Sequence, residues 1–446
     1  MDTIVAISTA LGAGAISIVR LSGDEAIDIV NSCFKGKDLR TVDSHTITYG
    51  YIYDNDKMID EVLVSVFKAP RTYTCEDVVE INCHGGMFVT NKVLELMLER
   101  GARIAESGEF TKRAFLNGRI DLTRAEAVMD VINSQTDKTL KLANSGLRGD
   151  IYNLISGLRT ELVNCIASIE VNIDYPEYEE EKEVTNDVLI PILNKLKLKL
   201  EDILEKANTS VLIREGIDTA IVGKPNVGKS SILNALIREK KAIVTSVAGT
   251  TRDIVEGKIN ISGVLLNLID TAGVRETDDI VEKIGINKAK EVIEKANLVL
   301  LVLDSSRSLD DEDKALIELT KDKKRIIIMN KSDLPAVNEF KEADIVISSG
   351  NEEDIYKLEA AIKKVCELNE INDIDATYIG NARQLSKIKE ALKAINDSLM
   401  GIEYGYPIDI INIDISKAWN SLGEIIGKVS SDDLLDTLFS NFCLGK

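Results

Sequence analysis

Residues 223–230 have the sequence Gly-Lys-Pro-Asn-Val-Gly-Lys-Ser, which is the pattern of a phosphate-binding loop. An apolar run at 218–222 precedes this stretch, and residues 231–238 have helical character, so the turn is expected between a strand and a helix. Glycines let the backbone wrap with its N–H groups pointing inward, and the positive end of the helix dipole adds to the cradle. We expect Lys229 to reach the outer phosphates and Ser230 to bind Mg²⁺.

A glycine turn can match this pattern by chance, but three further elements follow it in order. The first is Asp270-Thr271-Ala272-Gly273, which closes an apolar run at 264–269. Asp270 is therefore expected at the carboxyl end of a strand, the usual ligand crevice of such sheets. Its carboxylate suits the Mg²⁺ side of a nucleotide site, and Gly273 suits a γ-phosphate contact.

The second element is Asn330-Lys331-Ser332-Asp333, after a strand-like run at 325–329. Asp333 can accept two hydrogen bonds from guanine, a donor pair that adenine lacks, so this element specifies GTP over ATP. The third is the loop Gly-Thr-Thr-Arg-Asp at 249–253, which offers a Thr hydroxyl to Mg²⁺. Together these elements predict a GTPase. The expected GTP contacts are Asn226, Val227, Gly228, Lys229, Ser230, Ser231, Thr245, Thr250, Thr251, Asp270, Thr271, Ala272, Gly273, Asn330, Lys331 and Asp333, with Mg²⁺ on Ser230 and Thr251.

The composition limits the remaining possibilities. A length of 446 residues suggests two or three domains, each able to bury a core. The net charge of −20 argues against a surface that grips nucleic acid throughout, because neutralising phosphates needs clustered Lys and Arg; a local basic patch stays compatible. The six cysteines are scattered without a C-x-x-C pair, which indicates reduced thiols. With no secretory leader and no apolar run of about 20 residues, we expect a soluble, cytoplasmic protein without a membrane partner.

The sequence pattern changes along the chain. Residues 1–118 carry short strand-like runs and one clear helix at 88–100, which predicts an α+β domain. Apolar residues recur at helical spacing over 119–215 and 373–446, whereas 216–372 alternates strands and helices as a parallel sheet requires. We therefore predict a multidomain protein in which an α/β GTPase domain is inserted into a discontinuous helical domain.

Two acidic segments need an explanation. For residues 174–181, a solvated connection between helices is the ordinary interpretation, and a metal site is the alternative. Residues 276–282 follow Val274, which stands where many small GTPases have the Gln that orients the attacking water. The valine side chain cannot hydrogen-bond to water, so an acidic residue of this second segment is expected to position the attacking water instead. The alternative is that the segment is only a solvated acidic surface.

Both ends of the chain carry distinctive runs. They are Ser-Ile-Val-Arg-Leu-Ser-Gly at 17–23, Gly-Glu-Phe-Thr-Lys-Arg-Ala-Phe-Leu-Asn-Gly at 108–118 and Phe-Cys-Leu-Gly-Lys at 442–446. With the GTPase motifs between them, the whole chain resembles the MnmE (TrmE) family of tRNA modification GTPases. The GTPase motifs alone fit several families, whereas the two ends together are highly specific. The resemblance implies an N-terminal folate-binding domain that dimerises, a helical domain and an inserted Ras-like domain with a mostly parallel sheet.

The resemblance also implies partners and ligands. The FAD-dependent protein MnmG would join this chain in a heterotetramer-type complex that adds aminomethyl or carboxymethylaminomethyl groups to carbon 5 of the tRNA wobble uridine. A 5-formyl- or methylene-tetrahydrofolate would lie in the N-terminal domain near Arg20, Glu80, Arg119 and Lys446. A pterin N–H edge suits Glu80, and glutamyl carboxylates suit an arginine. Arg119 replaces the usual lysine of the family, which keeps the charge but changes its geometry.

Further assignments follow from the same resemblance. Glu282 would position the attacking water. A potassium ion would replace an arginine finger, because oxygen ligands at the right radius can displace its hydration shell; otherwise the Asn226 side chain only satisfies loop backbone groups. The expected potassium ligands are Asn226, Thr245, Val247 and Thr250. Cys443 would take part in tRNA modification, although a lone cysteine among apolar neighbours is most often a buried small hydrophobe.

Two functions of different classes remain open. One is a GTP-driven tRNA-modifying enzyme, and the other is a regulatory or ribosome-assembly GTPase whose flanking domains only bind RNA or protein. An RNA-binding module would carry a basic, aromatic-interleaved or GXXG surface. None is evident in this acidic chain, so the enzyme is preferred.

Overall fold

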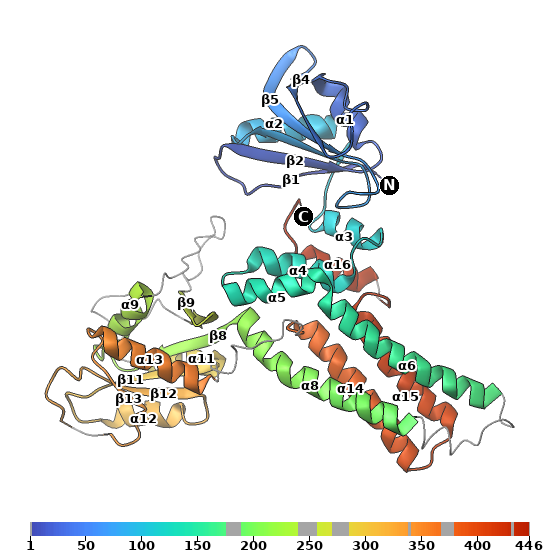
Figure 1. Cartoon of the computed structure of the whole chain (residues 1–446). Helices are drawn as coiled ribbons and strands as arrows, with labels where there is room; N and C mark the ends of the chain where they lie inside the picture. Colours follow the sequence, from blue (N-terminus) through green and yellow to red (C-terminus); the bar gives the residue numbers. More distant parts are fainter. Residues whose placement is uncertain are drawn as a thin grey trace. The chain divides into compact units, whose positions relative to one another are not determined.

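The computed structural model describes residues 2–174, 189–239, 257–269, 285–337, 340–366, 379–429 and 432–445. The chain forms two compact units, which we describe separately (Figure 1). The first unit combines Met1–Met129, Gly146–Val184 and Gly401–Lys446. The second combines Asp130–Ser145 and Thr185–Met400.

The first unit begins with a seven-stranded sheet in the order β3-β4-β5-β6-β2-β1-β7. Its strands are β1 (Ile4–Ile7), β2 (Ile16–Ser22), β3 (Phe34–Gly36), β4 (Thr46–Asp54), β5 (Lys57–Phe67), β6 (Val78–His84) and β7 (Arg103–Ile104). Neighbouring strands are antiparallel, except that β1 and β7 are parallel. Alternate side chains such as Val19 and Ile81 form a core with helices α1 (Ala26–Cys33) and α2 (Met87–Glu99). The expected α+β domain is confirmed, and α2 is its expected helix.

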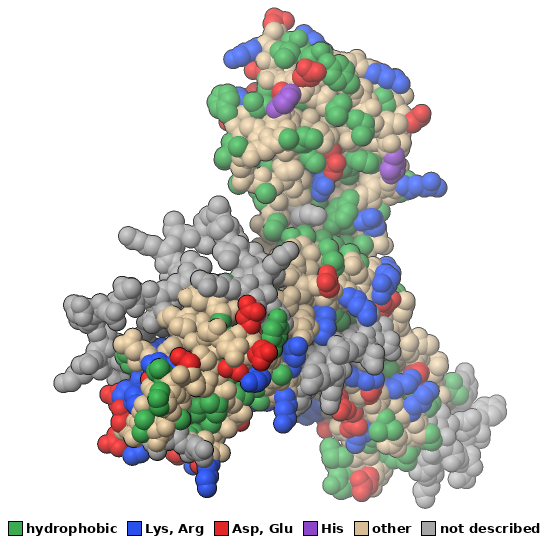
Figure 2. Space-filling model, turned by 60° about the vertical axis from the view of Figure 1, so that its left-hand side comes forward, with side chains coloured by type: hydrophobic (Ala, Val, Ile, Leu, Met, Phe, Trp, Pro, Cys, Tyr) green, Lys and Arg blue, Asp and Glu red, His purple; other side chains and the backbone are tan. Residues whose placement is uncertain are grey.

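On the opposite face of this sheet, the part formed by β4 and β5 is exposed, whereas Ile4 and Ala6 of β1 are buried in a cluster with Phe110. Ile47, Tyr49 and Leu63 on β4 and β5 are 68%, 54% and 45% accessible to solvent, and the register places Tyr49 directly opposite Leu63. In Figure 2, hydrophobic side chains lie among charged ones over the N-terminal domain, at the top of the view. This domain therefore presents apolar surface that its own two helices do not cover.

Helices make up the rest of the first unit. They include α3 (Glu109–Leu116), α4 (Leu122–Asn133), α6 (Asp150–Asp174), α15 (Ile408–Ile425) and α16 (Asp432–Ser440). Leu158 and Leu162 of α6 are buried at the spacing of one helix face. A second apolar cluster joins Leu122 of α4 to Phe439 of α16 and to Phe442. The C-terminal segment thus packs against helices that follow the N-terminal domain.

The second unit contains a six-stranded sheet in the order β13-β12-β11-β8-β10-β9. Its strands are β8 (Ile217–Val222), β9 (Lys258–Ile261), β10 (Val264–Leu268), β11 (Leu298–Asp304), β12 (Arg325–Asn330) and β13 (Ile345–Val346). All pairs are parallel except β9 with β10. One apolar core contains α9 (Lys229–Glu239) and α13 (Glu352–Val365), and the other contains α11 (Gly285–Lys295) and α12 (Asp311–Leu319). The expected α/β domain with a mostly parallel sheet is confirmed, and helices cover both faces of this sheet.

Two long helices flank this sheet in the sequence. Helix α8 (Ile190–Glu215) starts with a proline in its first turn and ends at Gly216, whose φ is +81°. Its expected apolar positions, Leu193, Leu196 and Leu200, are fully buried. Helix α14 (Ala382–Glu403) follows the sheet, and α5 (Asp137–Arg148) precedes α8. The helical segments on both sides of the α/β domain agree with the predicted insertion. Within the described residues, no helix is both long and apolar enough to span a membrane.

Candidate functional site

The predicted phosphate-binding loop lies between β8 and α9. Gly223 and Gly228 have φ values of +155° and +98°. A Cβ atom on Gly228 would lie 2.0 Å from Nδ2 of Asn330, and one on Gly223 would lie 2.4 Å from the carbonyl oxygen of Val302. The two glycines are therefore required both by backbone conformation and by close neighbours.

Lys229 is held inside this loop. Its Nζ donates hydrogen bonds to the carbonyl oxygens of Gly223, at 3.0 Å, and Lys224, at 2.7 Å. Burial lowers the pKa of the Lys229 ammonium, because removal from water disfavours the charged form of the side chain. Carbonyl groups supply only partial charge, so a phosphate would satisfy this ammonium better.

The predicted guanine-recognition element, residues 330–333, contacts the phosphate loop through Asn330. This side chain is 1% exposed; its Nδ2 donates to the carbonyl oxygen of Val227 at 2.8 Å, and its Oδ1 accepts from the backbone N–H of Ser349 at 3.1 Å. Asp333 accepts a hydrogen bond from the Ser348 hydroxyl at 2.9 Å. The structure therefore brings the phosphate loop, residues 330–333 and the loop at 348–349 together.

Several predicted residues lie outside the described part of the chain, so their roles stay predictions. They are Thr245, Val247, Thr250, Thr251, Asp270, Thr271, Ala272, Gly273, Glu282 and Lys446, together with Val274. The potassium site is described only at Asn226, which is exposed and has a φ of +62°. For magnesium, only Ser230 at the start of α9 is described.

A second group of predicted residues lies on the face of the N-terminal sheet opposite α1 and α2. Arg20 of β2 and Glu80 of β6 are register partners. Nε and Nη2 of Arg20 lie 2.9 and 2.8 Å from Oε1 of Glu80. The Arg20 guanidinium also lies 5.7 Å from the centre of the Phe110 ring. The sequence predicted both residues as ligand contacts, and the structure shows that they are also partners of each other.

Arg119, from a different segment, lies next to Tyr73, which packs against the apolar cluster that contains Phe110. Its guanidinium lies 5.0 Å from the centre of the Tyr73 ring, and its Nη1 donates to the Tyr73 carbonyl oxygen at 3.2 Å. Arg20 and Arg119 therefore both lie next to aromatic rings of one cluster, although the residues are far apart in the sequence.

The C-terminal segment reaches this site. The carbonyl oxygen of Gly445 accepts hydrogen bonds from Ser8 Oγ at 3.2 Å and from Arg20 Nη1 at 3.3 Å. Gly445 has a φ of +86°, and an added Cβ would lie 2.6 Å from the carbonyl oxygen of Ile7. Cys443 is exposed, so the interpretation of this residue as a buried hydrophobe is wrong. Exposure beside the segment that contacts Arg20 leaves a chemical role open to it.

Comparison with known proteins identifies the family. Residues 3–119 match the model described as GTP-binding protein TrmE N-terminus, and residues 122–443 match the MnmE helical domain. The tRNA modification GTPase MnmE of Streptococcus thermophilus is 53% identical over 100% of this chain and 98% of its own length. The chain belongs to the MnmE family. The same protein of Lactococcus lactis subsp. cremoris is 50% identical, and that of Bacillus mycoides is 51% identical, each over 100% of this chain.

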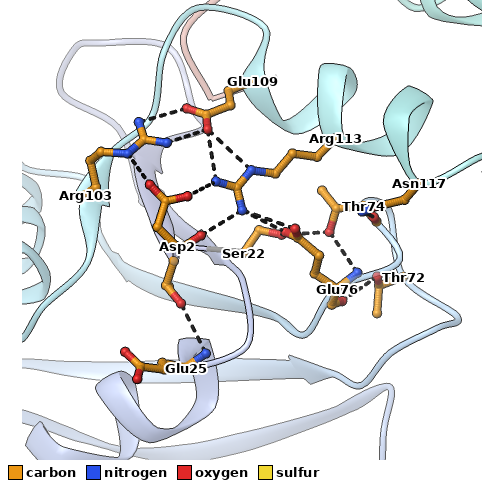
Figure 3. Close-up of polar contacts among 11 residues, drawn as sticks. Asp2, Ser22, Glu25, Thr72, Thr74, Glu76, Arg103, Glu109, Arg113 and Asn117 are labelled. Atoms are coloured by element: carbon orange, nitrogen blue, oxygen red, sulfur yellow. Dashed lines mark hydrogen bonds and ion pairs between the residues drawn. The ribbon is translucent and has the colours of Figure 1, made fainter.

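One feature of this MnmE family member was missed by the sequence analysis. Arg113 of α3 is buried and contacts three carboxylates (Figure 3). Its Nη1 lies 3.1 Å from Oε1 of Glu76, and its Nη2 lies 3.0 Å from Oε1 of Glu109 and 2.7 Å from Oδ1 of Asp2. Arg103 completes the group by contacting Asp2 and Glu109. Only the i,i+4 pair of Glu109 and Arg113 could have been predicted, because the other members come from separate segments.

This network fixes the start of α3 rather than forming a further binding site. Its five charged members pair with one another, and Ser22 donates to Glu76 at 2.7 Å. Glu109 also accepts from the backbone N–H of Glu106 at 2.8 Å. Because Phe110 and Thr111 follow Glu109 in α3, the network positions the helix that supplies the aromatic ring next to Arg20.

Proposed function

We propose that this MnmE family member hydrolyses GTP and, with the FAD-dependent protein MnmG, adds an aminomethyl or carboxymethylaminomethyl group to carbon 5 of the wobble uridine in tRNA. Full-length similarity to relatives named tRNA modification GTPase supports the tRNA role. The observation that carries the GTP assignment is the Asn330 side chain, which joins the phosphate loop to the guanine element. The alternative, a regulatory or ribosome-assembly GTPase, has no comparable support.

For hydrolysis, the chain supplies positive charge, orientation and a positioned water. Lys229 faces the outer phosphates, Asn330 and Asp333 select guanine, and Glu282 orients the attacking water. Ser230 and Thr251 would hold Mg²⁺, which when bound would supply positive charge next to the phosphates. The glycine cradle and the partly desolvated Lys229 fit such a nucleotide.

The modification adds a carbon atom to the uridine ring, and we propose that a tetrahydrofolate supplies it. Its proposed site is formed by Arg20, Glu80, Arg119 and Lys446. Glu80 can accept hydrogen bonds from a pterin edge, and the arginines can hold glutamyl carboxylates. The Arg20–Glu80 pair is partly exposed, with 19% and 21% of the two side chains accessible, so a ligand can reach it. A bound tetrahydrofolate would supply the one-carbon unit of the modification, and Cys443 lies on the segment that contacts Arg20.

The oligomer and domain limits are also proposals. Exposed Ile47, Tyr49 and Leu63 on the same sheet face support a homodimer through the N-terminal domain, because contiguous exposed apolar side chains mark interaction surfaces. We propose domains at residues 1–118, 119–215, 216–372 and 373–446, of which 216–372 is the G domain. A cytoplasmic location follows from the tRNA and MnmG partners.

The function is tested by mass spectrometry of wobble nucleosides from cells that lack this protein. Aminomethyl-type uridines should disappear and should return with the wild-type gene, but not with Lys229→Ala. Unchanged wobble uridines in the deletion strain would refute the tRNA role. Accumulation of ribosomal precursors with normal wobble uridines would instead support the ribosome-assembly alternative.

The folate site is tested by calorimetric titration with 5-formyltetrahydrofolate. Arg20→Ala and Glu80→Ala should each abolish detectable binding, because each removes a charged partner of the ligand and leaves the other unpaired. GDP binding by the phosphate loop, which belongs to the second unit, serves as the check that both variants are folded. Arg40→Ala is the matched control, since Arg40 is an exposed arginine of the same domain that pairs with Asp38. Full folate affinity in both site variants would remove this assignment.

A further inference from the structure

Asp304 is a buried carboxylate beside the guanine-recognition element. It ends strand β11 and is 5% exposed. Its Oδ2 accepts from Lys331 Nζ at 2.7 Å. Its Oδ1 accepts from the backbone N–H of Ser306 at 2.9 Å and from the Ser306 hydroxyl at 2.6 Å. The strand register pairs Asp304 with Asn330, the residue directly before Lys331.

Lys331 has an unusual backbone conformation. Its φ is +66°, a left-handed value that residues other than glycine, asparagine and aspartate rarely adopt. The turn at Lys331 sets the direction of the next residues: the backbone N–H of Ser332 donates to the carbonyl oxygen of Ile347 at 3.1 Å, and Asp333 accepts from Ser348. The orientation of Asp333 toward a guanine ring therefore depends on a turn that is intrinsically unfavourable.

The Asp304 carboxylate is suited to hold this turn. Burial alone would raise the pKa of Asp304, but hydrogen bonds from Lys331 and Ser306 outweigh it and keep that pKa below its usual range. Asp304 is thus ionised at neutral pH. A buried carboxylate that lost its cation would be left uncompensated, so the Lys331 side chain is strongly retained at this position.

We propose that Asp304 is a positioning residue for guanine recognition, which fixes Lys331 and thereby the direction of Asp333 without touching the nucleotide. The proposal rests on the proposed GTP site and adds a residue to it. It differs from a purely structural role, in which Asp304 would only cap its own turn through Ser306.

The test is fluorescence titration of nucleotide-free protein with labelled GDP and with labelled inosine diphosphate, which lacks the exocyclic amine of guanine. Asp304→Asn keeps the size of the side chain and an acceptor for Ser306, but removes the charge that holds Lys331. GDP affinity should fall about tenfold, as for the loss of a charged hydrogen bond. The preference for GDP over inosine diphosphate should also fall, because Asp333 would no longer be directed at both guanine donors.

A double-mutant cycle tests whether Asp304 affects GDP binding through Lys331. In a Lys331→Met background, Asp304→Asn should have little further effect, because the two residues act through one contact. Asp304→Glu keeps a carboxylate within reach of Lys331 and should bind GDP more tightly than Asp304→Asn. Melting curves check that each variant is folded.

Two variants serve as matched controls. Asp313→Asn changes another fully buried carboxylate of the second unit, which pairs with Arg307 at 3.0 Å. Ser306→Ala removes the hydroxyl that donates to Asp304 but keeps the backbone N–H donor of the same residue. Both should keep the affinity for GDP and the base preference of the wild type.

The proposal is overturned if Asp304→Asn lowers only the melting temperature, if its loss of affinity persists in the Lys331→Met background, or if Asp304→Glu binds GDP more weakly than Asp304→Asn. A wild-type protein that does not bind GDP at all would instead refute the GTP site itself, so the two failures are distinguishable.

Discussion

Gly228 and Asn330 show how closely single residues fit at the proposed nucleotide site. The sequence predicted both, one as a loop glycine and the other as part of a guanine element. It could not predict that the missing Cβ of Gly228 makes room for the Asn330 amide, because this contact joins two segments that only the fold brings together. The same limit applies to Asp304, whose pairing with Lys331 depends on strand register.

At Asn226 we predict a potassium response. Its side chain is exposed on the phosphate loop, where an amide oxygen can help to coordinate a monovalent cation that stabilises charge on the phosphates. Wild-type GTP hydrolysis should be faster in K⁺ than in matched Na⁺ buffer, and Asn226→Ala should lose most of this difference. Asn297→Ala, at another exposed asparagine of the second unit, is the control. Equal rates in both buffers, or full stimulation of Asn226→Ala, would exclude Asn226 and K⁺ from the mechanism.

The cysteines should differ sharply in reactivity. Burial raises the pKa of Cys33 and of Cys165 to about 11, so at pH 8 only about one thiol in a thousand is ionised at each position. Cys443 is exposed. Iodoacetamide should therefore label Cys443 in the folded protein well before Cys33 or Cys165, as measured by peptide mass spectrometry. Unfolding in urea should expose all of them, and equal labelling in the folded state would contradict the burial.

At the scale of elements, apolar periodicity was a reliable guide. It predicted α2 and α8, each of which buries one face, and continuous apolar runs predicted β8, β10 and β12. Sequence pattern treats charged residues as surface, however, so it gave no sign that α3 is anchored by buried ion pairs. The network around Arg113 gathers carboxylates from the start of the chain, from the loop before β6 and from α3 itself.

Removal of Arg113 should strongly destabilise the N-terminal domain. Arg113→Met keeps the length of the side chain but leaves the buried Glu76 without the arginine that pairs with it, and Glu109 with Arg103 alone. Loss of one partner of a buried ion pair typically costs roughly 3–5 kcal/mol of unfolding free energy. Urea denaturation followed by circular dichroism would measure the change. Arg40→Met, at an arginine with an exposed partner, should have no measurable effect. A small effect of Arg113→Met would mean that water or neighbouring cations replace the lost charge.

The same network predicts acid sensitivity. Burial would raise the pKa of Glu109, but hydrogen bonds from Arg103, the Glu106 backbone and Arg113 outweigh it and hold that pKa below its usual range. The folded state therefore binds fewer protons than the unfolded state, and this stabilisation is present above the ordinary pKa of glutamate and is lost as the pH falls below it. Urea unfolding between pH 7 and pH 3 should show the loss. Glu109→Gln should weaken the dependence of the unfolding free energy on pH. If this dependence is the same in Glu109→Gln as in the wild type, Glu109 is not the source of the acid sensitivity.

At the scale of the whole molecule, changes in sequence pattern were enough to predict an α/β domain inserted between helical segments. The pattern could not show that residues near both ends meet at one sheet, because Gly445, Ser8 and Arg20 interact through backbone and polar groups that have no periodicity. The short runs that carried the family resemblance are the segments that make these contacts.

Gly445→Ala should weaken the proposed folate site. A methyl group there would lie 2.6 Å from the carbonyl oxygen of Ile7 at a φ of +86°, so the segment must shift away from Arg20. Affinity for 5-formyltetrahydrofolate should fall at least several-fold in a calorimetric titration, with an unchanged melting temperature. Gly86→Ala is the control, because no atom lies near its added Cβ. Wild-type affinity in Gly445→Ala would show that the tail does not shape the site.

The path of the chain into and out of the α/β domain has a practical consequence. Arg214, near the end of α8, donates to the carbonyl oxygen of Gly380, just before α14, at 3.2 Å, and an added Cβ on Gly380 would lie 3.3 Å from that of Ser210. The two attachment points of the insertion are thus neighbours, as is common where domain insertion is tolerated. We therefore expect that residues 217–378 can be exchanged for a short linker, or for a sensor domain with adjacent termini, provided that the replacement covers Ile213 of α8, which packs into the α/β core.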